Sequence, residues 1–225
     1  MLAWVYDAAA RAKVFDRLLV ATDSEEVAEV CRSHGWECRL TSASLVSGTD
    51  RVHAVAQQLA AEAGDGNSGA DGENIFVNIQ GDEPLLRPEH FHALLRPFTR
   101  SGVEVTTVMT PCPADGIHNP NVVKVVVDRN GKALYFSRAP IPWNRDQRDG
   151  VRYWKHLGLY AYRKRVLDRF PTLPPSQLEA AERLEQLRLL ENGIDLHVEA
   201  VEFDTIGVDT EEDRLAAAAL LSQRG

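Results

Sequence analysis

The stretch Asn78-Ile79-Gln80-Gly81-Asp82-Glu83-Pro84 decides the fold, because it closes an apolar segment that begins at Ile75. Ile75 to Ile79 is predicted to be a buried strand that stops at a glycine and is followed at once by two carboxylates. In open α/β sheets, ligands collect just outside the carboxyl ends of the strands. Asp82 is therefore expected where a metal-bound phosphate would lie. An ordinary strand exit is the alternative, since Gly, Asp and Pro are common in such turns.

Composition and net charge narrow the possible classes of protein. The 225 residues are 44% hydrophobic and 26% charged, which is ordinary for a soluble globular protein. A formal net charge of -8 argues against general binding to nucleic acid or anionic membranes, but allows a local basic pocket for a small anion. Cys31, Cys38 and Cys112 lack metal-ligand spacing, so we expect reduced thiols in a cytoplasmic protein. Neither a signal peptide nor a membrane span is expected, since no apolar run approaches about 18 residues.

Helices and strands alternate in the first part of the chain. Asp23 is predicted to cap a helix that runs through His34, with Glu26 completing a capping box. A polar, Gly-rich surface loop is expected over 64–73. The order β-α-β-α is typical of a doubly wound sheet. The other elements expected here are a helix over 1–13, strands over 17–22 and 37–40, and a helix over 50–63.

The pattern changes after the strand at 75–79. Asp128-Arg129-Asn130-Gly131 separates two apolar segments, and Asn-Gly is a strong hairpin signal. The predicted fold is therefore α/β, a Rossmann-like sheet with an antiparallel hairpin lobe inserted in its second half. We expect one domain, 1–225, with the hairpin lobe at 119–162. The remaining elements expected are helices at 88–99, 164–169, 178–191 and 210–221, and strands at 103–109, 122–127, 133–137, 157–162 and 196–201.

Two further loops carry side chains suited to a phosphorylated ligand. In Ser47-Gly48-Thr49-Asp50-Arg51, the N–H groups at a helix start and the arginine suit an anion or a base edge. A capping loop with Thr49 or Asp50 as N-cap is the alternative. Asp209, in Gly207-Val208-Asp209-Thr210, could likewise be an N-cap. Yet Asp82 and Asp209 at one sheet edge would suit Mg²⁺ held by few protein oxygens, which neutralises charge in nucleotidyl transfer.

Three other stretches place polar or charged side chains where a bound ligand would account for them. Each also has an ordinary interpretation: a hairpin edge, a buried histidine with its partners, and an amphipathic helix. The stretches are Arg138 among aromatic residues and prolines, His156 with Gly158 and Tyr160 on one strand face, and Glu182 with Gln186 on one helix face beside Glu185.

These stretches belong to a series of motifs whose order is more specific than any one motif. Single motifs are shared with other nucleotidyltransferases, but the ordered set closely resembles the 3-deoxy-manno-octulosonate (Kdo) cytidylyltransferases along nearly the whole chain. The motifs are Ala-Thr-Asp at 21–23, Ser-Gly-Thr-Asp-Arg-Val at 47–52, Asn-Ile-Gln-Gly-Asp-Glu-Pro at 78–84, Asn-Pro-Asn-Val-Val-Lys-Val-Val at 119–126, Leu-Tyr-Phe-Ser-Arg at 134–138, Ile-Pro-Trp at 141–143, His-Leu-Gly-Leu-Tyr at 156–160, Leu-Glu-Gln-Leu-Arg at 184–188 and Gly-Val-Asp-Thr at 207–210.

The resemblance implies a nucleotide-diphospho-sugar transferase type of sheet and a cytoplasmic, Mg²⁺-dependent enzyme. Such an enzyme makes CMP-Kdo and pyrophosphate from CTP and Kdo for lipopolysaccharide synthesis. A homodimer joined partly through the hairpin lobe is also implied, with Trp143 at the interface. By resemblance, Asp82 and Asp209 would hold Mg²⁺, Ser47, Gly48 and Arg51 would meet the nucleotide, Gln80 would lie between nucleotide and sugar, and Arg138, His156, Tyr160, Glu182, Glu185 and Gln186 would line the Kdo pocket.

The chain departs from the family pattern at its start. Family members open with a strand and a loop of the kind Pro-Ala-Arg-x-x-Ser-x-Arg-Leu-Pro-Gly-Lys-Pro, whose basic residues grip the triphosphate. Met1 falls just after the position of that loop. Two neighbouring strands are therefore expected to lack a hydrogen-bonding partner. The chain as written is expected to have little or no cytidylyltransferase activity, through a late start, a true truncation or the decay of a paralogue.

Two other functions stay open at this point. A nucleotidyltransferase for another acid sugar or base would share several of the motifs, although His156, Tyr160 and Gln186 argue against it. A catalytically silent binding or dimer-partner protein would keep the sugar pocket without the phosphate loop. A substrate panel separates the first from a Kdo enzyme, and the reading frame upstream of Met1 tests the second.

Overall fold

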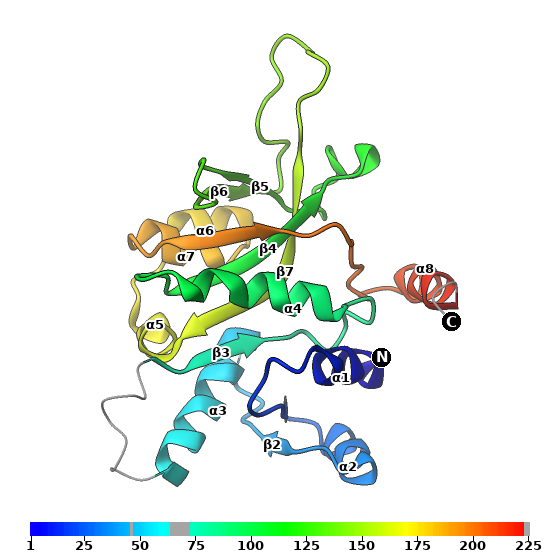
Figure 1. Ribbon diagram of the computed structural model, residues 1–225, viewed down its shortest axis with the longest axis vertical. Coiled ribbons are helices and arrows are strands. Elements are labelled where there is room, and N and C mark those ends of the chain that lie inside the picture. The colour runs from blue at the N-terminus through cyan, green and yellow to red at the C-terminus, as the bar shows by residue number, and fades with distance from the viewer. Residues whose placement is uncertain (46, 64–72, 223–225) are drawn as a thin grey trace.

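A mixed sheet of six strands forms the body of the protein in the computed structural model, which describes residues 1–45, 47–63 and 73–222 (Figure 1). Strand β7 is antiparallel to β3, β4 and β5, while β4 and β8 are parallel. Strands β3, β4 and β8 therefore run the same way, and their carboxyl ends lie at one edge of the sheet. The strands are β3 (Ile75–Asn78), β4 (Val105–Pro111), β5 (Lys124–Val127), β6 (Ala133–Ser137), β7 (Trp154–Arg163) and β8 (Leu196–Ala200).

Strands β1 (Val20–Thr22) and β2 (Cys38–Leu40) form a separate two-stranded parallel sheet. An open cleft of about 1010 Å³ separates β1 from β3, and apolar side chains of both strands line it. Within the described residues, β3 pairs with β7 alone and β1 pairs with β2 alone, so each has a side without a partner strand. This agrees with the expectation that two neighbouring strands lack a hydrogen-bonding partner.

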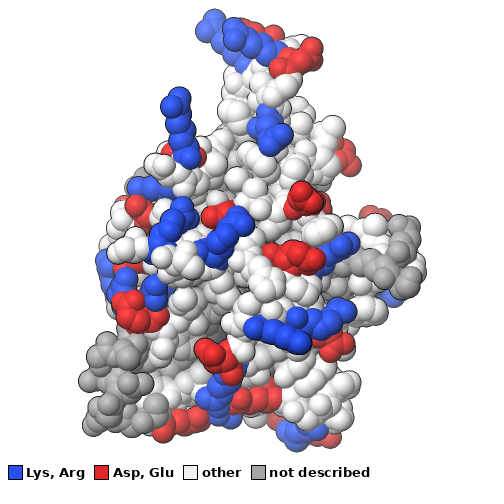
Figure 2. Space-filling view, viewed as in Figure 1, with Lys and Arg blue, Asp and Glu red and all other residues white. Residues whose placement is uncertain are grey.

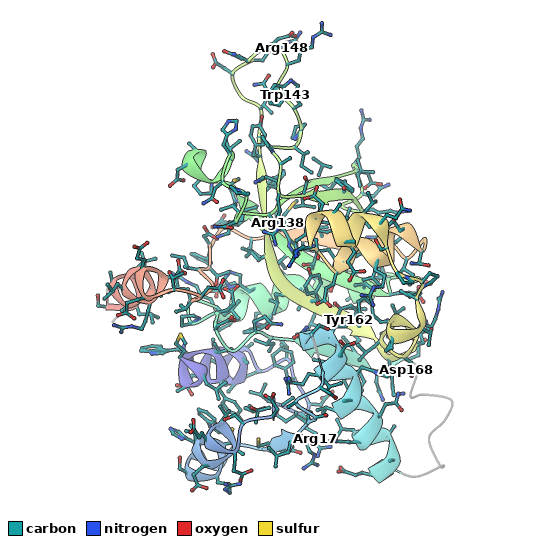
Figure 3. The ribbon with its side chains drawn as sticks, turned by 180° about the vertical axis from the view of Figure 1, so that it is seen from behind. Arg17, Arg138, Trp143, Arg148, Tyr162 and Asp168 are labelled. Carbon is teal, nitrogen blue, oxygen red and sulfur yellow. The ribbon has the colours of Figure 1, made fainter. Side chains whose placement is uncertain are left out.

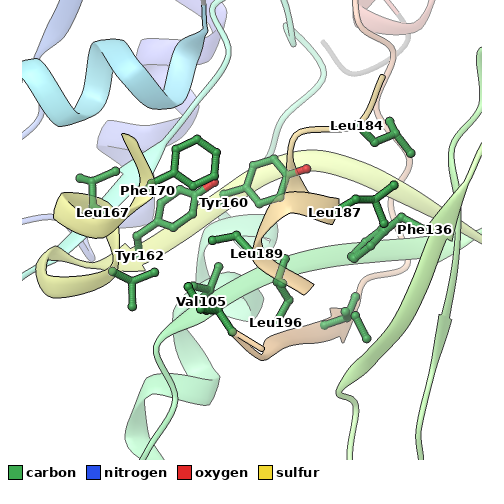
Figure 4. Packing of buried hydrophobic residues seen from close by; sticks show 14 of the residues in the cluster. Val105, Phe136, Tyr160, Tyr162, Leu167, Phe170, Leu184, Leu187, Leu189 and Leu196 are labelled. Atoms are coloured by element: carbon green, nitrogen blue, oxygen red, sulfur yellow. The ribbon is translucent and has the colours of Figure 1, made fainter. Parts of the chain in front are cut away.

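Helices cover both faces of the larger sheet. On one face, α3, α5 and α7 enclose an apolar cluster that includes Tyr160, Tyr162, Phe136 and Leu187 (Figure 4). On the other face, α1 and α4 pack on Leu157 and residues of β4. Helix α8 stands apart at the end of a long segment (Figure 1). The helices are α1 (Leu2–Ala12), α2 (Glu25–His34), α3 (Gly48–Ala63), α4 (Pro88–Leu95), α5 (Lys164–Arg169), α6 (Gln177–Glu182), α7 (Gln186–Glu191) and α8 (Glu211–Ser222).

Most of the predicted elements are present, with shifted ends. The α/β class and the antiparallel β5–β6 hairpin are confirmed, and Gly131 takes the positive φ of 79° that its turn requires. The predicted helix at 88–99 changes to a 3₁₀ turn over its last four residues, Arg96–Thr99. The predicted loop at 64–73 lies outside the described residues except for Glu73.

The cap of α2 is one residue later than predicted. Ser24, in extended conformation, accepts a hydrogen bond from the Val27 N–H at 3.3 Å, so the helix begins at Glu25. The carboxylate of Asp23 instead lies 3.4 Å from the guanidinium of Arg51. A serine and an aspartate side by side are both suitable caps, and in the structure Ser24 caps the helix while Asp23 pairs with Arg51.

The single helix predicted at 178–191 is wrong, because the chain forms α6 and α7 with a break between them. Arg183 ends α6 with a left-handed φ of 53°. The guanidinium of Arg138 then binds the freed carbonyl oxygen of Glu182 at 2.8 Å. Glu182 and Gln186 therefore do not share one helix face.

Lys124 holds the base of the hairpin lobe together. Its side chain is buried and its ammonium donates to three backbone carbonyl oxygens, those of Asn119 (2.9 Å), Val122 (2.5 Å) and Arg138 (2.7 Å). Burial lowers the pKa of Lys124. The three carbonyl groups come from both sides of the hairpin, so one cation fixes the position of Arg138 relative to the loop at 119–122.

Replacing Lys124 by methionine is expected to lower the free energy of unfolding by about 2–4 kcal/mol, because three buried carbonyl groups lose their donor. Urea unfolding followed by circular dichroism measures this change. Lys132→Met is the matched control, since Lys132 pairs with Asp195 at the surface and its removal should cost less than about 1 kcal/mol. Equal losses in the two variants would contradict the role given to Lys124.

Candidate active site

Asp82 and Asp209 lie on two loops that meet at the carboxyl edge of the larger sheet. The loop after β3 carries Asp82, and the segment after β8 carries Asp209. The Val208 N–H donates a hydrogen bond to the carbonyl oxygen of Asp82 at 2.9 Å. Burial, and then the nearby charge of Asp209, raise the pKa of Asp82. The structure therefore brings together the two carboxylates that the sequence singled out.

Glu83 fastens the segment after β8 to the loop of Asp82. The Thr205 hydroxyl donates a hydrogen bond to Oε2 of Glu83. From the other side, the ammonium of Lys155 on β7 donates to the carbonyl oxygen of Thr205 and pairs with Asp204, both at 2.8 Å. The segment that leads to Asp209 is thus held by a carboxylate and by a cation, and its freedom to move away from Asp82 is small.

His90 on α4 fixes the same segment further back. Its Nδ1 accepts a hydrogen bond from the Arg87 N–H at 3.0 Å, so the proton lies on Nε2, which donates to the carbonyl oxygen of Phe203 at 2.9 Å. Burial lowers the pKa of His90, which keeps the ring neutral. The guanidinium of Arg87 lies 4.0 Å from the centre of the Phe203 ring.

The pair of carboxylates suits a hard divalent cation bound by few protein oxygens. Two carboxylates at one edge repel each other when both are ionised, and a cation between them relieves that repulsion. In the part of the chain that the structure describes, no group of three or more His, Cys, Asp and Glu residues could hold a metal ion. Water and the oxygens of a phosphorylated substrate would therefore have to complete the shell of a cation at Asp82 and Asp209.

The predicted nucleotide loop lies against the end of β3. The Ser47 hydroxyl accepts a hydrogen bond from the Asp50 N–H at 3.1 Å, so Ser47, rather than Thr49 or Asp50, caps α3. Gly48 follows, and a Cβ atom there would lie 2.6 Å from Nε2 of Gln80. Only glycine therefore admits the side chain of Gln80 at its observed place.

Asn78 orients Gln80. The Gln80 amide donates to Oδ1 of Asn78 at 3.0 Å, and Nδ2 of Asn78 is buried without a hydrogen-bond partner among the described residues. Both amides lie beside Gly48. Arg51, one helical turn on, is held by the Thr41 hydroxyl and by Asp23, and it lines the cleft between β1 and β3.

His156 and Tyr160 of β7 share one face of the sheet, as predicted, and their ring centres lie 5.4 Å apart. Gly158 lies between them in a bulge of β7 opposite Thr107 and Val108. Burial lowers the pKa of His156 to about 3. Gln186, the first residue of α7, is 4% exposed, and its Nε2 has no hydrogen-bond partner among the described residues.

The side chains of Arg138 and Glu182 bind each other's backbone. The Glu182 carboxylate accepts hydrogen bonds from the Ser137 hydroxyl at 2.6 Å and from the Arg138 N–H at 2.9 Å. The Arg138 guanidinium donates to the carbonyl oxygens of Glu182 and Pro120. Figure 3 shows Arg138 at the base of the hairpin lobe, close to the paired helices α6 and α7. These contacts give both residues a structural task beside the sugar contacts implied for them.

Glu185 connects the two halves of the site. It accepts a hydrogen bond from the Thr49 hydroxyl at 3.0 Å, and burial raises its pKa. Thr49 lies in the first turn of α3, directly after the loop expected to meet the nucleotide. Glu185, expected in the sugar pocket, is thus aimed at the nucleotide loop.

Sequence reasoning missed the residues that hold this site in place. Glu83 belongs to the motif at 78–84, and its position next to Asp82 is the available signal. Asn78 belongs to the same motif, and Gln80 two residues later is its partner. Lys155, Thr205 and Thr107 carry no signal of their own in the sequence, because their partners lie far away in the chain.

The raised pKa of Asp82 predicts a dependence of stability on pH. The folded protein binds this proton more tightly than the unfolded chain does, so ionisation of Asp82 costs stability as the pH rises. In metal-free buffer, Asp82→Asn should therefore unfold with a larger free energy than the unchanged chain at neutral pH. The difference should vanish as the pH falls toward about 4, the ordinary pKa of an aspartate. Urea unfolding across this pH range measures the difference between the two proteins. An Asp82→Asn chain that is no more stable than the unchanged chain at neutral pH would refute the prediction.

Gly48→Ala is expected to destabilise the protein by about 1 kcal/mol, because the new methyl group displaces the end of the Gln80 side chain from Asn78. The matched control is the same change in a Gln80→Ala chain, where the methyl group meets less resistance. There, alanine should be neutral or stabilising, because it favours a helix over glycine by about 1 kcal/mol. A double-mutant cycle from thermal unfolding measures the coupling, and additive effects would show that the two residues do not interact.

A family model described as cytidylyltransferase matches residues 1–200. A 3-deoxy-manno-octulosonate cytidylyltransferase of Acidobacterium capsulatum is 55% identical over 224 residues, which cover 100% of this chain and 86% of the relative. A protein of the same name from Koribacter versatilis is 51% identical, with 100% of this chain and 81% of the relative covered.

The fold agrees with these relatives. A solved structure described as CMP:2-keto-3-deoxy-manno-octonic acid synthetase complexed with CTP matches with a TM-score of 0.88 and 35% identity, covering 100% of this chain and 88% of that chain. A 4-diphosphocytidyl-2C-methyl-D-erythritol synthase of Anaerococcus prevotii shares the fold alone, with a TM-score of 0.60 and 16% identity, over 98% of this chain and 88% of that chain. The chain therefore belongs to the cytidylyltransferase family, and within it to the 3-deoxy-manno-octulosonate cytidylyltransferases.

Proposed function

We propose that this chain transfers the cytidylyl group of CTP to Kdo and releases pyrophosphate. The observation that carries the proposal is the meeting of Asp82 and Asp209 beside Gln80 and Gly48 at the carboxyl edge of the sheet. In the reaction, the anomeric hydroxyl oxygen of Kdo bonds to the α-phosphorus of CTP while the bond from that phosphorus to the pyrophosphate oxygen breaks. Both groups are anionic, so charge neutralisation and positioning are the main needs.

Asp82 and Asp209 would hold Mg²⁺, whose charge would offset that of the phosphate oxygens. Their pairing on two fixed loops supports this assignment, since Val208 bonds to Asp82 and Glu83 to Thr205. The N–H groups at the start of α3 would face a phosphate or the base, aided by the positive end of the helix dipole. Gln80, held between Asn78 and Gly48, would contact both substrates.

The sugar would bind on the other side of Gln80. Gln80, Glu83, Gly158 and Thr205 lie together, which places the bulge of β7 next to the acidic loops. His156, Tyr160 and Gln186 then supply polar atoms in largely buried surroundings. Arg138, Glu182 and Glu185 would complete the pocket wall, with Arg138 and Glu182 fixed by their mutual bonds.

The chain would act as a cytoplasmic homodimer joined through the hairpin lobe. Trp143 is 74% exposed and projects from the extended part of the lobe (Figure 3), and Leu134 is 60% exposed on the neighbouring hairpin.

Cys31, Cys38 and Cys112 are free thiols. On the face shown in Figure 2, acidic and basic side chains are interspersed, with no broad basic area of the kind that binds nucleic acid. None of the described helices could cross a membrane.

Pyrophosphate release from CTP, Kdo and Mg²⁺ tests the proposal. Because an open cleft separates β1 from β3, the assay is run on this chain and on a version extended by the part of the Acidobacterium capsulatum relative that the match leaves uncovered. We expect at least one of the two forms to release pyrophosphate, and only when Kdo is present. In that form, Asp82→Asn and Asp209→Asn should each lower kcat/KM by at least about 100-fold. N-Acetylneuraminate and UTP serve as the competing sugar and nucleotide. Release with neither protein form, or a preference for another sugar, would overturn the proposal.

A further inference from the structure

Thr107 on β4 is the direct neighbour of His156. Its side chain is wholly buried, and its Oγ1 lies 2.9 Å from Nε2 of His156. The imidazole also packs edge-on against Phe136, with ring centres 4.8 Å apart. The ring is therefore held in one orientation by a hydroxyl on one side and an aromatic ring on the other.

A count of protons assigns the tautomer of His156. Oγ1 of Thr107 also lies 2.8 Å from the carbonyl oxygen of Leu159 and 3.3 Å from that of Leu157. A hydroxyl has one proton to donate, and carbonyl oxygens only accept. The proton of Thr107 therefore goes to a carbonyl oxygen, with Leu159 the nearer one. The lone pair of Oγ1 then accepts from His156, which places the imidazole proton on Nε2.

The bulge in β7 is what brings these carbonyl groups to Thr107. The register of β4 and β7 shifts between Thr107 and Val108, with Gly158 and Leu159 as the extra residues. A bulge disturbs the ladder of backbone hydrogen bonds, and the Thr107 hydroxyl supplies a donor at that point. If the hydroxyl donated to His156 instead, it would have no proton left for either carbonyl oxygen.

The other ring nitrogen, Nδ1, then carries a lone pair, since the hydrogen bond to Thr107 is made by Nε2. Burial keeps the ring neutral, since it lowers the pKa of His156 to about 3. A neutral ring with a free lone pair accepts a hydrogen bond from a hydroxyl. It has no charge for a carboxylate and no proton on Nδ1 to donate to one.

Gln186 supplies the complementary chemistry. Its Nε2 is a buried donor without a partner, and its neighbours Leu184 and Leu187 belong to the same apolar cluster as Phe136 and Tyr160. A buried donor of this kind is costly unless a ligand accepts from it. His156 and Gln186, which both lie beside the cluster of Phe136 and Tyr160, thus offer one acceptor and one donor, which is what a ligand with several hydroxyl groups requires.

We propose that Thr107 is a positioning residue that fixes His156 in the tautomer with the proton on Nε2, so that Nδ1 accepts a hydrogen bond from a hydroxyl of the sugar acid instead of binding its carboxylate. The identity of the hydroxyl-bearing ligand rests on the proposed function. The tautomer and its dependence on Thr107 rest on the geometry alone.

Nitrogen NMR of the histidine rings tests the tautomer without any need for catalysis. The protein is labelled with ¹⁵N on its histidines, and the spectrum of His156→Gln identifies the signals of His156. We expect a protonated Nε2 and an unprotonated Nδ1 in the unchanged chain and in Thr107→Ser, which keeps the hydroxyl. Thr107→Val, which has the same shape without the hydroxyl, should show a changed proton distribution. A proton on Nδ1 in the unchanged chain, or no change in Thr107→Val, would overturn the proposal.

Addition of Kdo tests the ligand side. Kdo should move the Nδ1 signal of His156 in the unchanged chain and in Thr107→Ser. In the form that is active in pyrophosphate release, Thr107→Val should raise the KM for Kdo roughly tenfold, with kcat and the KM for CTP little changed, because about 1.4 kcal/mol of sugar binding is lost. Loss of kcat alone would contradict a role in sugar binding. If no protein form releases pyrophosphate, the proposed function fails while the NMR result still decides the tautomer.

Discussion

One backbone hydrogen bond, from the Val208 N–H to the carbonyl oxygen of Asp82, joins the two loops on which the site depends. Strands β3 and β8 are not neighbours, since β7 and β4 lie between them. Their carboxyl ends nevertheless lie at one edge, because β7 runs antiparallel to both β3 and β4. The loops must then bridge the remaining distance, and the contacts of Glu83 and Lys155 with the segment at 204–205 keep them there.

Strand β7 connects this acidic edge to the polar pocket beside it. One end of the strand pairs with β3 and the other with β5, while β4 runs along its opposite side. The bulge at Gly158 interrupts the regular ladder between these ends and turns two carbonyl groups toward Thr107. The same strand thus sets the position of Lys155 near Asp204 and the orientation of His156. A change in the bulge would affect both halves of the site together.

The sequence allowed the fold class, the hairpin lobe and the acidic pair to be predicted, because each rests on a local pattern. Asn130-Gly131 requires a tight turn, and Asp82 and Asp209 each follow a strand or precede a helix. What could not be predicted depends on distant partners. Arg183 breaks a helix that its own periodicity favours, and the contacts of Arg138 with the freed carbonyl groups come from a segment more than forty residues away.

The same limit applies to the site. Glu83 is one acid among many until Thr205 is seen beside it. In the sequence, Lys124 cannot be distinguished from an exposed lysine of a strand, yet in the structure it is buried among three carbonyl groups. The edge position of β3 follows from the cleft next to β1, which no local pattern reveals. Propensity and spacing identify elements and motifs, while partners that lie far apart in the chain decide how the elements are joined.

Binding of Mn²⁺, followed by electron paramagnetic resonance in the presence of CTP and without Kdo, tests the central claim most directly. If Asp82 and Asp209 hold one cation as a unit, Asp82→Asn and Asp209→Asn should each weaken binding about as much as the double variant does. Exposed Asp195→Asn, next to the amino end of β8 and therefore at the opposite edge of the sheet, is the matched control and should bind as the unchanged chain does. Binding that survives in either single variant would contradict a shared site.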